Sequence, residues 1–210
     1  MRTIIVESQY LPGIAYFSLL LSADHVIIDG HEHYVRQTYR NRAEILGSNG
    51  VIDLTVPVIR SRSRQVFKST KIDNTYGWQK IHWRGIRSSY GKSPFFEYYA
   101  DNLRVCYEKR YDSLVDLNHD VMSCLVKLTG LSLEINYSDR YVEAEGVESK
   151  DYISVIAPKN KSQFLPQFEN ITYSQVFGNK FVKGLSLIDL LFCEGPNAGQ
   201  LLRKMANIWQ

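Results

Sequence analysis

Apolar and polar positions at the amino end of the chain predict a strand, a helix and a second strand. Residues 3–6 and 25–28 are apolar runs with the length of short buried strands, and apolar side chains recur at helical spacing over residues 14–21. A strand, a helix and a strand within 29 residues have the spacing of a crossover between two parallel strands. Ligands of such units usually bind beyond the carboxyl ends of the strands, which here fall at residues 7–10 and 29–33.

The rest of the pattern predicts a chain that becomes mainly helical toward its carboxyl end. Residues 47–50 form a strong turn signal. A helix at 78–90 is expected to turn Trp78, Ile81 and Ile86 inward. The other expected elements are a short helix at 39–46, strands at 51–59, 134–137 and 153–156, a polar linker at 159–169, and helices at 94–104, 107–129, 185–192 and 197–208.

These elements define the expected fold class. A chain of 210 residues, of which 44% are apolar, can bury one core, and no repeat or low-complexity tract divides it. We therefore expect an α/β protein in which an amino-terminal strand-helix-strand unit with a small, mainly parallel sheet precedes a predominantly helical carboxyl half. Residues 1–210 are expected to form a single domain, with a basic α/β portion at 1–92 and a mainly helical portion at 93–210.

Targeting and redox signals are weak. The longest apolar run, residues 14–21, is much shorter than the roughly 18 residues of a membrane span, and the amino terminus does not resemble a secretion signal, so we expect a cytoplasmic protein. Cys106, Cys124 and Cys193 are odd in number, widely spaced and without a CxxC motif, which argues against a disulfide framework. Buried thiols are expected, and Cys193, at a helix end, is the candidate for a catalytic thiol.

Charge is distributed unevenly along the chain. Residues 31–92 carry twelve Lys and Arg against four Asp and Glu, a net charge of +8, whereas the remainder carries −5. An asymmetry of this size indicates an anionic ligand or a contact between the two regions.

The stretch HEHYVRQTYRNR, residues 31–42, concentrates candidate chemistry directly after the second strand. On an extended chain His31 and His33 project from one face, as in a metal clamp or an acid/base pair. A metal would require a further ligand from Asp29, Glu32 or His82. A solvated or hydrogen-bonded histidine pair is the more common arrangement, so no metal is expected.

Three arginines of the same stretch are the candidates for anion binding. Arg36 and Arg40 are four residues apart, and Arg42 lies close by. Guanidinium groups without matching carboxylates suit a phosphate or sulfate, because each offers paired donors and a permanent charge. The alternatives are a solvated turn and a bridge to the acidic carboxyl half.

A second concentration is the segment 78–99. On a helix Trp78 and His82 are one turn apart, as are Lys80 and Arg84, which gives one aromatic side and one basic side. One interpretation is a platform for a sugar or nucleotide, in which an indole stacks on a ring, a cation meets a phosphate and His82 moves a proton. The other is a core pair, Trp78 and Trp83, with a solvated basic face.

Four separated blocks carry a resemblance to a known family. They read QYLPGIAYFSLLLSADHVIID, HEHYVRQTYRNRAEILGSNGVIDLTVPV, HWRGIRSSYGKSPFFEYY and LSLIDLLFCEGPN, in this order. Together they resemble the WbqC-like family of bacterial proteins over essentially the whole chain. Ser8 replaces a proline of the usual Gln-Pro-x-Tyr-x-Pro opening, a change that affects the backbone more than the chemistry. The motif positions found here are Gln9, Tyr10, Pro12, Asp29, Tyr34, Arg40, Asn41, Arg42, His82, Arg84, Ser88, Tyr90, Pro94 and Phe95.

The resemblance implies a setting for the function. The family is largely uncharacterised, and its members are associated with O-antigen and other surface-polysaccharide gene clusters, where glycine or amino-acyl transfer to a sugar has been suggested. Such a transferase would bind a phosphorylated or nucleotide-linked small molecule and deprotonate the accepting group. The residues expected in these roles are Arg36, Arg40, Arg42 and Arg84 for the phosphates, Tyr34, Trp78 and Trp83 for the rings, and His82 or His33 for the proton.

Other functions use the same residues. Because the chain has no P-loop and no GxGxxG motif, the activated donor and any cofactor are unknown. A non-catalytic protein that binds an anion, a nucleotide or, less favoured, a nucleic acid would also use arginines and aromatic side chains, and the basic run at 60–71 is compatible with it. A scaffold in a biosynthetic complex is a third possibility, with the aromatic helix at 95–111 as a subunit interface in a homo-oligomer.

Overall fold

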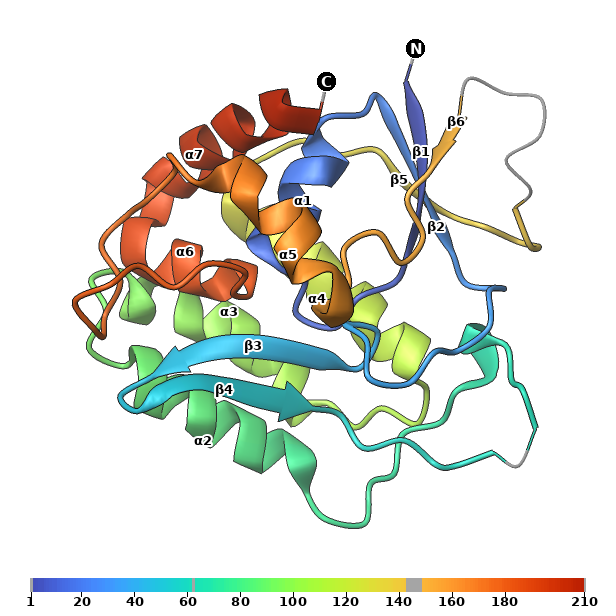
Figure 1. Cartoon of the computed structure of the whole chain (residues 1–210). Coiled ribbons are helices and arrows are strands. Elements are labelled where there is room, and N and C mark those ends of the chain that lie inside the picture. Colours follow the sequence, from blue (N-terminus) through green and yellow to red (C-terminus); the bar gives the residue numbers. More distant parts are fainter. Residues whose placement is uncertain (1, 62, 143–148, 210) are drawn as a thin grey trace.

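Four parallel strands form the main sheet, in the order β5, β2, β1, β6 (Figure 1). The computed structural model describes residues 2–61, 63–142 and 149–209. Glu7 is in register with Asp29, so the polar residues that follow β1 and β2 leave the sheet at the same edge. The strands are β1 Thr3–Glu7, β2 His25–Asp29, β5 Ile135–Tyr137 and β6 Ser149–Asp151.

The helix α1, Ile14–Leu21, connects β1 and β2 and confirms the predicted strand-helix-strand unit. Residues 14–20 are all buried. Helices α6, Leu187–Glu194, and α7, Ala198–Ala206, pack against it, so α1 is buried around most of its circumference. In Figure 1, α1 lies between the strands β1 and β2 and the carboxyl-terminal helices, which are distant from it in sequence.

Helices dominate the second half of the chain, as predicted. Helix α4 ends at Gly130, whose φ of 64° is the left-handed conformation that glycine adopts without strain. Among the described residues, no helix has the length and apolarity needed to cross a membrane. The helices after α1 are α2 Trp78–Tyr90, α3 Phe96–Glu108, α4 Leu114–Thr129, α5 Lys161–Phe164, α6 Leu187–Glu194 and α7 Ala198–Ala206.

The prediction of a short helix at 39–46 was wrong. This segment contains β3, Arg42–Gly47, which pairs antiparallel with β4, Gly50–Thr55, around the predicted turn (Figure 1). The physical reason is the alternation along β3, where Ala43 and Ile45 are buried between half-buried polar residues. The strand expected at 51–59 is confirmed in its first half and ends before Pro57.

Three further boundaries differ from the sequence expectation. The last strand is β6 rather than 153–156, where Ser154 has a φ of 61° that an extended strand does not allow. The long helix expected at 107–129 is interrupted between α3 and α4. The linker at 159–169 contains α5 and short 3₁₀ turns.

The side chain of Ile81, which was expected to face inward, is exposed. Ile81 is 59% exposed, because the buried stripe of α2 follows every fourth residue from Trp78 and leaves Ile81 on another face.

Candidate functional site

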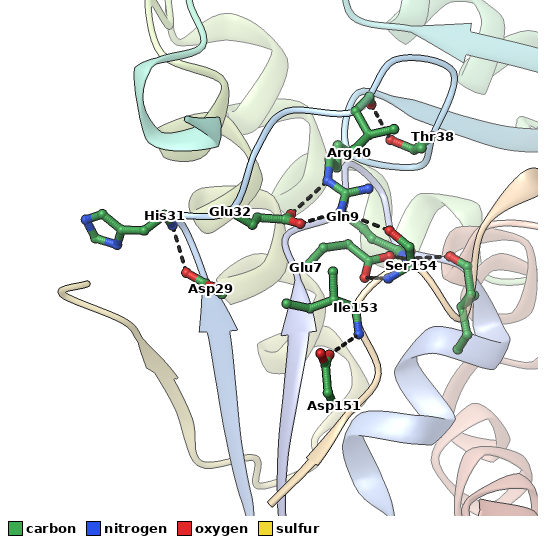
Figure 2. Close-up of polar contacts among 12 residues, drawn as sticks. Glu7, Gln9, Asp29, His31, Glu32, Thr38, Arg40, Asp151, Ile153 and Ser154 are labelled. Carbon is green, nitrogen blue, oxygen red and sulfur yellow. Dashed lines mark hydrogen bonds and ion pairs between the residues drawn. The ribbon is translucent and has the colours of Figure 1, made fainter. Parts of the chain in front are cut away.

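A buried polar cluster occupies the carboxyl ends of β1 and β2, where the sequence placed the site (Figure 2). The residues Glu7, Asp29, Glu32 and Arg40 are all at most 5% exposed. Three carboxyl groups and one guanidinium therefore share a region from which water is largely excluded. Buried charges require partners, and each of these groups has them.

Arg40 is held by Glu32 in a bidentate ion pair. Its Nε and Nη2 donate to the two carboxylate oxygens at 2.7 and 2.5 Å, and Nη2 also donates to Ser154 Oγ at 3.2 Å. Burial raises the pKa of Glu32 to about 7, although Arg40 opposes this rise. The sequence singled out Arg40 for a ligand phosphate, but the structure commits its Nε and Nη2 to Glu32 and Ser154, whereas its Nη1 is buried and has no hydrogen-bond partner among the described residues.

Glu7 anchors a turn that lies far away in sequence. Its carboxylate accepts from Gln9 Nε2 at 2.9 Å and from the backbone N–H of Ser154 at 2.6 Å. Ser154 is held in the left-handed region, which is unusual for a residue with a side chain. Gln9, predicted as a site residue, also donates to the carbonyl of Ile156 at 3.1 Å. No role was predicted for Glu7 or Ser154 from the sequence, and only the position of Glu7 at a strand end could have indicated one.

Asp29 shapes the start of the histidine stretch. Its Oδ1 accepts from the backbone N–H of His31 at 2.8 Å and from Ser138 Oγ at 2.9 Å, and its Oδ2 accepts from the backbone of Val142 at 3.4 Å. Figure 2 shows Asp29 at the end of its strand with His31 directed away from the buried ion pair. Asp29 thus fixes the backbone from which His31 projects.

Beside this cluster lies a basic surface depression that we call the arginine hollow. It consists of two adjoining spaces of about 470 and 420 Å³ that share Tyr34, Arg36, Val58 and Arg60 as lining residues. Volumes of this order suit a small organic ligand. The charged and aromatic side chains that define the hollow are His33, Tyr34, Arg36, Arg42, Arg60 and Arg64.

The hollow joins two stretches that are about twenty-five residues apart. The backbone N–H of Tyr34 donates to the carbonyl of Gln65 at 2.9 Å, and that of Phe67 donates to the carbonyl of Glu32 at 2.7 Å. These bonds align the histidine stretch with the basic run at 60–71. The structure thereby assembles arginines that the sequence showed only as two separate clusters. Arg62 lies outside the described residues.

Within the described part of the chain, the arginines of the hollow have no acidic partner. Among the ion pairs of the described residues, none involves Arg36, Arg42, Arg60 or Arg64, and no Asp or Glu lines the hollow. The Nε of Arg42 is buried and has no hydrogen-bond partner there either. Asn41 lines the same space, although its Nδ2 donates to the carbonyl of Val56 at 2.8 Å.

His82 lies in the core rather than in the hollow. Its Nδ1 is 2.9 Å from the hydroxyl of Tyr10, which is 2.8 Å from the hydroxyl of Tyr107. Burial lowers the pKa of His82 to about 4, and a backbone hydrogen bond with Thr55 opposes this in part. His82 is therefore neutral at pH 7, and it does not line the arginine hollow, although its backbone partner Thr55 does.

The predicted ring-binding tryptophans are packing residues in this structure. Trp78 is 3% exposed and meets the rings of Tyr10 and His82 edge to face, while Trp83 stacks on Phe96. The remaining predicted residues of α2 lie apart from the hollow. Tyr90 is buried and donates to Asp189, whereas Arg84 and Ser88 are exposed.

Metal and thiol chemistry have little support at these positions. Within the described part of the chain, no group of three His, Cys, Asp or Glu side chains is placed to hold a metal ion. Burial, with a contribution from Asp189, raises the pKa of Cys193 to about 12. Cys193 is thus a protonated thiol at neutral pH rather than an activated nucleophile.

Comparison with known proteins agrees with the sequence blocks. The model of the WbqC-like protein family matches residues 7–167 and 157–201. Uncharacterized protein Rv1507c of Mycobacterium tuberculosis is 29% identical over 229 residues, covering 96% of this chain and 97% of the relative. No solved structure gave a significant match. The family match spans nearly the whole fold described above, and the chain belongs to the WbqC-like protein family.

Proposed function

We propose that this protein binds a phosphorylated, nucleotide-linked sugar in the arginine hollow and transfers an acyl or amino-acyl group to it during bacterial surface-polysaccharide synthesis. The observation that carries the binding step is that Arg36, Arg42, Arg60 and Arg64 line the two adjoining spaces of the hollow, with no carboxylate from the described residues among the lining. The transfer step and its setting rest on the family resemblance.

A diphosphate matches the chemistry of the hollow. Neighbouring guanidinium groups repel one another, and an anion that binds between them removes this repulsion and accepts several charge-assisted hydrogen bonds. The unpartnered Nε of Arg42 supplies one buried donor that a phosphate oxygen would satisfy. Such bonds contribute about 1.5–3 kcal/mol each.

Two side chains of the hollow suit the rest of such a ligand. Tyr34 is half-buried and presents a ring against which a base or sugar can pack. His33 is exposed at the same wall, where its imidazole can accept a proton from a hydroxyl or amine. His33 is therefore the proposed general base, in preference to the buried His82.

Isothermal titration calorimetry with UDP- and dTDP-sugars tests the binding step. Arg36→Gln and Arg60→Gln should each weaken binding by about tenfold or more, because each removes charge-assisted donors. Arg203→Gln is the matched control, since Arg203 is an exposed arginine on α7 outside the hollow. Equal affinity for all four proteins, or no binding by the wild type, would refute the proposal.

A nucleic acid is the second candidate, because Arg60, Arg64, Lys68 and Lys71 form an exposed basic run. Binding of single-stranded oligonucleotides should then weaken steeply with salt and be much tighter than binding of any nucleotide-sugar. A nucleotide-sugar that competes fully with the oligonucleotide at low ionic strength would favour the first candidate.

A further inference from the structure

Two of the three cysteines, eighteen residues apart in sequence, meet at the interface of α3 and α4. The Sγ of Cys124, on α4, donates to the backbone carbonyl of Asn102, on α3, at 3.5 Å. In an α-helix, that carbonyl accepts from the residue four positions later, which is Cys106. The thiol of Cys124 therefore lies against the turn of α3 that carries Cys106.

The two thiols differ in accessibility and acidity. Cys106 is 5% exposed, whereas Cys124 is only partly buried. A hydrogen bond between the thiols lowers the pKa of Cys124, helped by Lys127, and the same bond raises the pKa of Cys106. Cys124 is thus the thiol that a reagent in solution reaches first, and it has the higher thiolate fraction.

We infer that Cys106 and Cys124 form a reversible disulfide, with a low-molecular-weight disulfide such as oxidised glutathione as the oxidant. The inference stands on the contact of the Cys124 thiol with the Cys106 turn and on the access to Cys124 from solvent. It is independent of the proposed ligand and reaction.

The spacing of packed helices permits this bond. Packed helix axes lie about 8–10 Å apart and Cα atoms lie about 2.3 Å from each axis, so directly facing Cα atoms are about 3.4–5.4 Å apart. Disulfides join Cα atoms separated by about 4.4–6.8 Å. The contact between a thiol and the opposing backbone shows that α3 and α4 approach closely at this level.

The reaction proceeds in two exchange steps. The Cys124 thiolate attacks one sulfur of oxidised glutathione, so that the Cys124–glutathione bond forms, the glutathione disulfide breaks and one glutathione thiolate leaves. Cys106 then loses its proton and attacks the Cys124 sulfur, which forms the Cys106–Cys124 bond and expels the second glutathione. Two protein thiols are oxidised, and one glutathione disulfide is reduced to two glutathione molecules.

The bond would fix the α3–α4 hairpin, and the connection between these two helices supports the end of the basic run. The backbone N–H of Leu114, at the start of α4, donates to the carbonyl of Thr70 at 3.0 Å, and that of Ile72 donates to the carbonyl of Asp112 at 3.0 Å. A cross-link between the helices therefore stiffens the base on which residues 70–72 rest.

Mass spectrometry of the folded protein after incubation with oxidised glutathione tests this inference. In the wild type we expect the loss of two hydrogens, one remaining alkylatable thiol and a Cys106–Cys124 cross-linked peptide. Cys193→Ser should give the same cross-link, since Cys193 lies on α6.

The single variants separate the two steps. Cys106→Ser should keep a stable glutathione adduct on Cys124, because no second thiol expels it. Cys124→Ser should form neither a glutathione adduct nor an internal disulfide. Cys106→Ala replaces Cys106→Ser if the hydroxyl prevents folding. A lasting glutathione adduct in the wild type, a cross-link through Cys193, or three unreacted thiols would overturn the inference.

Discussion

The protonation state of His82 gives the sharpest stability prediction. We compare the wild type with His82→Gln, whose amide can accept from the Tyr10 hydroxyl and donate to the Thr55 backbone but cannot titrate. Burial lowers the pKa of His82 from 6.5 to about 4. In the unfolded chain His82 therefore takes up a proton near pH 6.5, whereas in the folded protein it is protonated only near pH 4.

This shift has a calculable effect on stability. The contribution of His82 to the free energy of unfolding is fully present above pH 6.5 and is lost as the pH falls toward 4. The full loss corresponds to about 3 kcal/mol, of which roughly 2 kcal/mol is lost between pH 7.5 and pH 5. The sign is opposite to that of Glu32, whose contribution is common to both proteins and cancels in their difference.

Urea unfolding followed by tryptophan fluorescence at pH 5, 6 and 7.5 provides the assay. The wild type should lose about 2 kcal/mol relative to His82→Gln across this range. A stability difference between the two proteins that does not change with pH would refute the argument that His82 is a buried neutral side chain. So would a His82 imidazole signal that titrates near pH 6.5 by NMR. It would also restore His82 as a candidate base.

The other predictions concern the buried cluster and one helix end. Burial raises the pKa of Glu32 from 4.5 to about 7. Its contribution to the free energy of unfolding is therefore present below pH 4.5 and is lost as the pH rises through 7. In urea titrations, Glu32→Gln should gain stability relative to the wild type between pH 4.5 and 8. Arg40→Ala should lower the free energy of unfolding by about 3–5 kcal/mol at pH 8, because it leaves Glu32 charged and buried without its partner. The double variant Arg40→Met/Glu32→Leu should lower it clearly less. Equal losses would contradict the ion-pair account. Gly130→Ala should lower the free energy of unfolding by about 1 kcal/mol, since the residue after α4 has a φ of 64°, and an unchanged melting temperature would show that the cap is not strained by a side chain.

Local patterns predicted much of the fold because the information lies within short segments. The apolar runs of β1 and β2 and the helical spacing between them were sufficient for the strand-helix-strand unit. The prediction for 39–46 was wrong because a segment this short can form either a helix or a strand, and only the pairing with β4 decides between them.

The site was predicted less completely, because its contacts join distant residues. No local pattern indicates that Arg40 pairs with Glu32 while Arg36 and Arg42 turn to the hollow, or that Arg60 completes it. His82 stood out by residue type, but its hydrogen-bond partner Tyr10 comes from the segment after β1, and Tyr10 in turn contacts Tyr107 of α3.

The most direct test of the central claim is NMR of the arginine Nε–H groups during titration with a UDP-sugar. The account predicts that the signals of Arg36, Arg42 and Arg60 shift together and saturably, while those of Arg40 and Arg203 change little. Saturable binding with unchanged signals from the hollow, or shifts that follow only ionic strength, would contradict a ligand site at this surface.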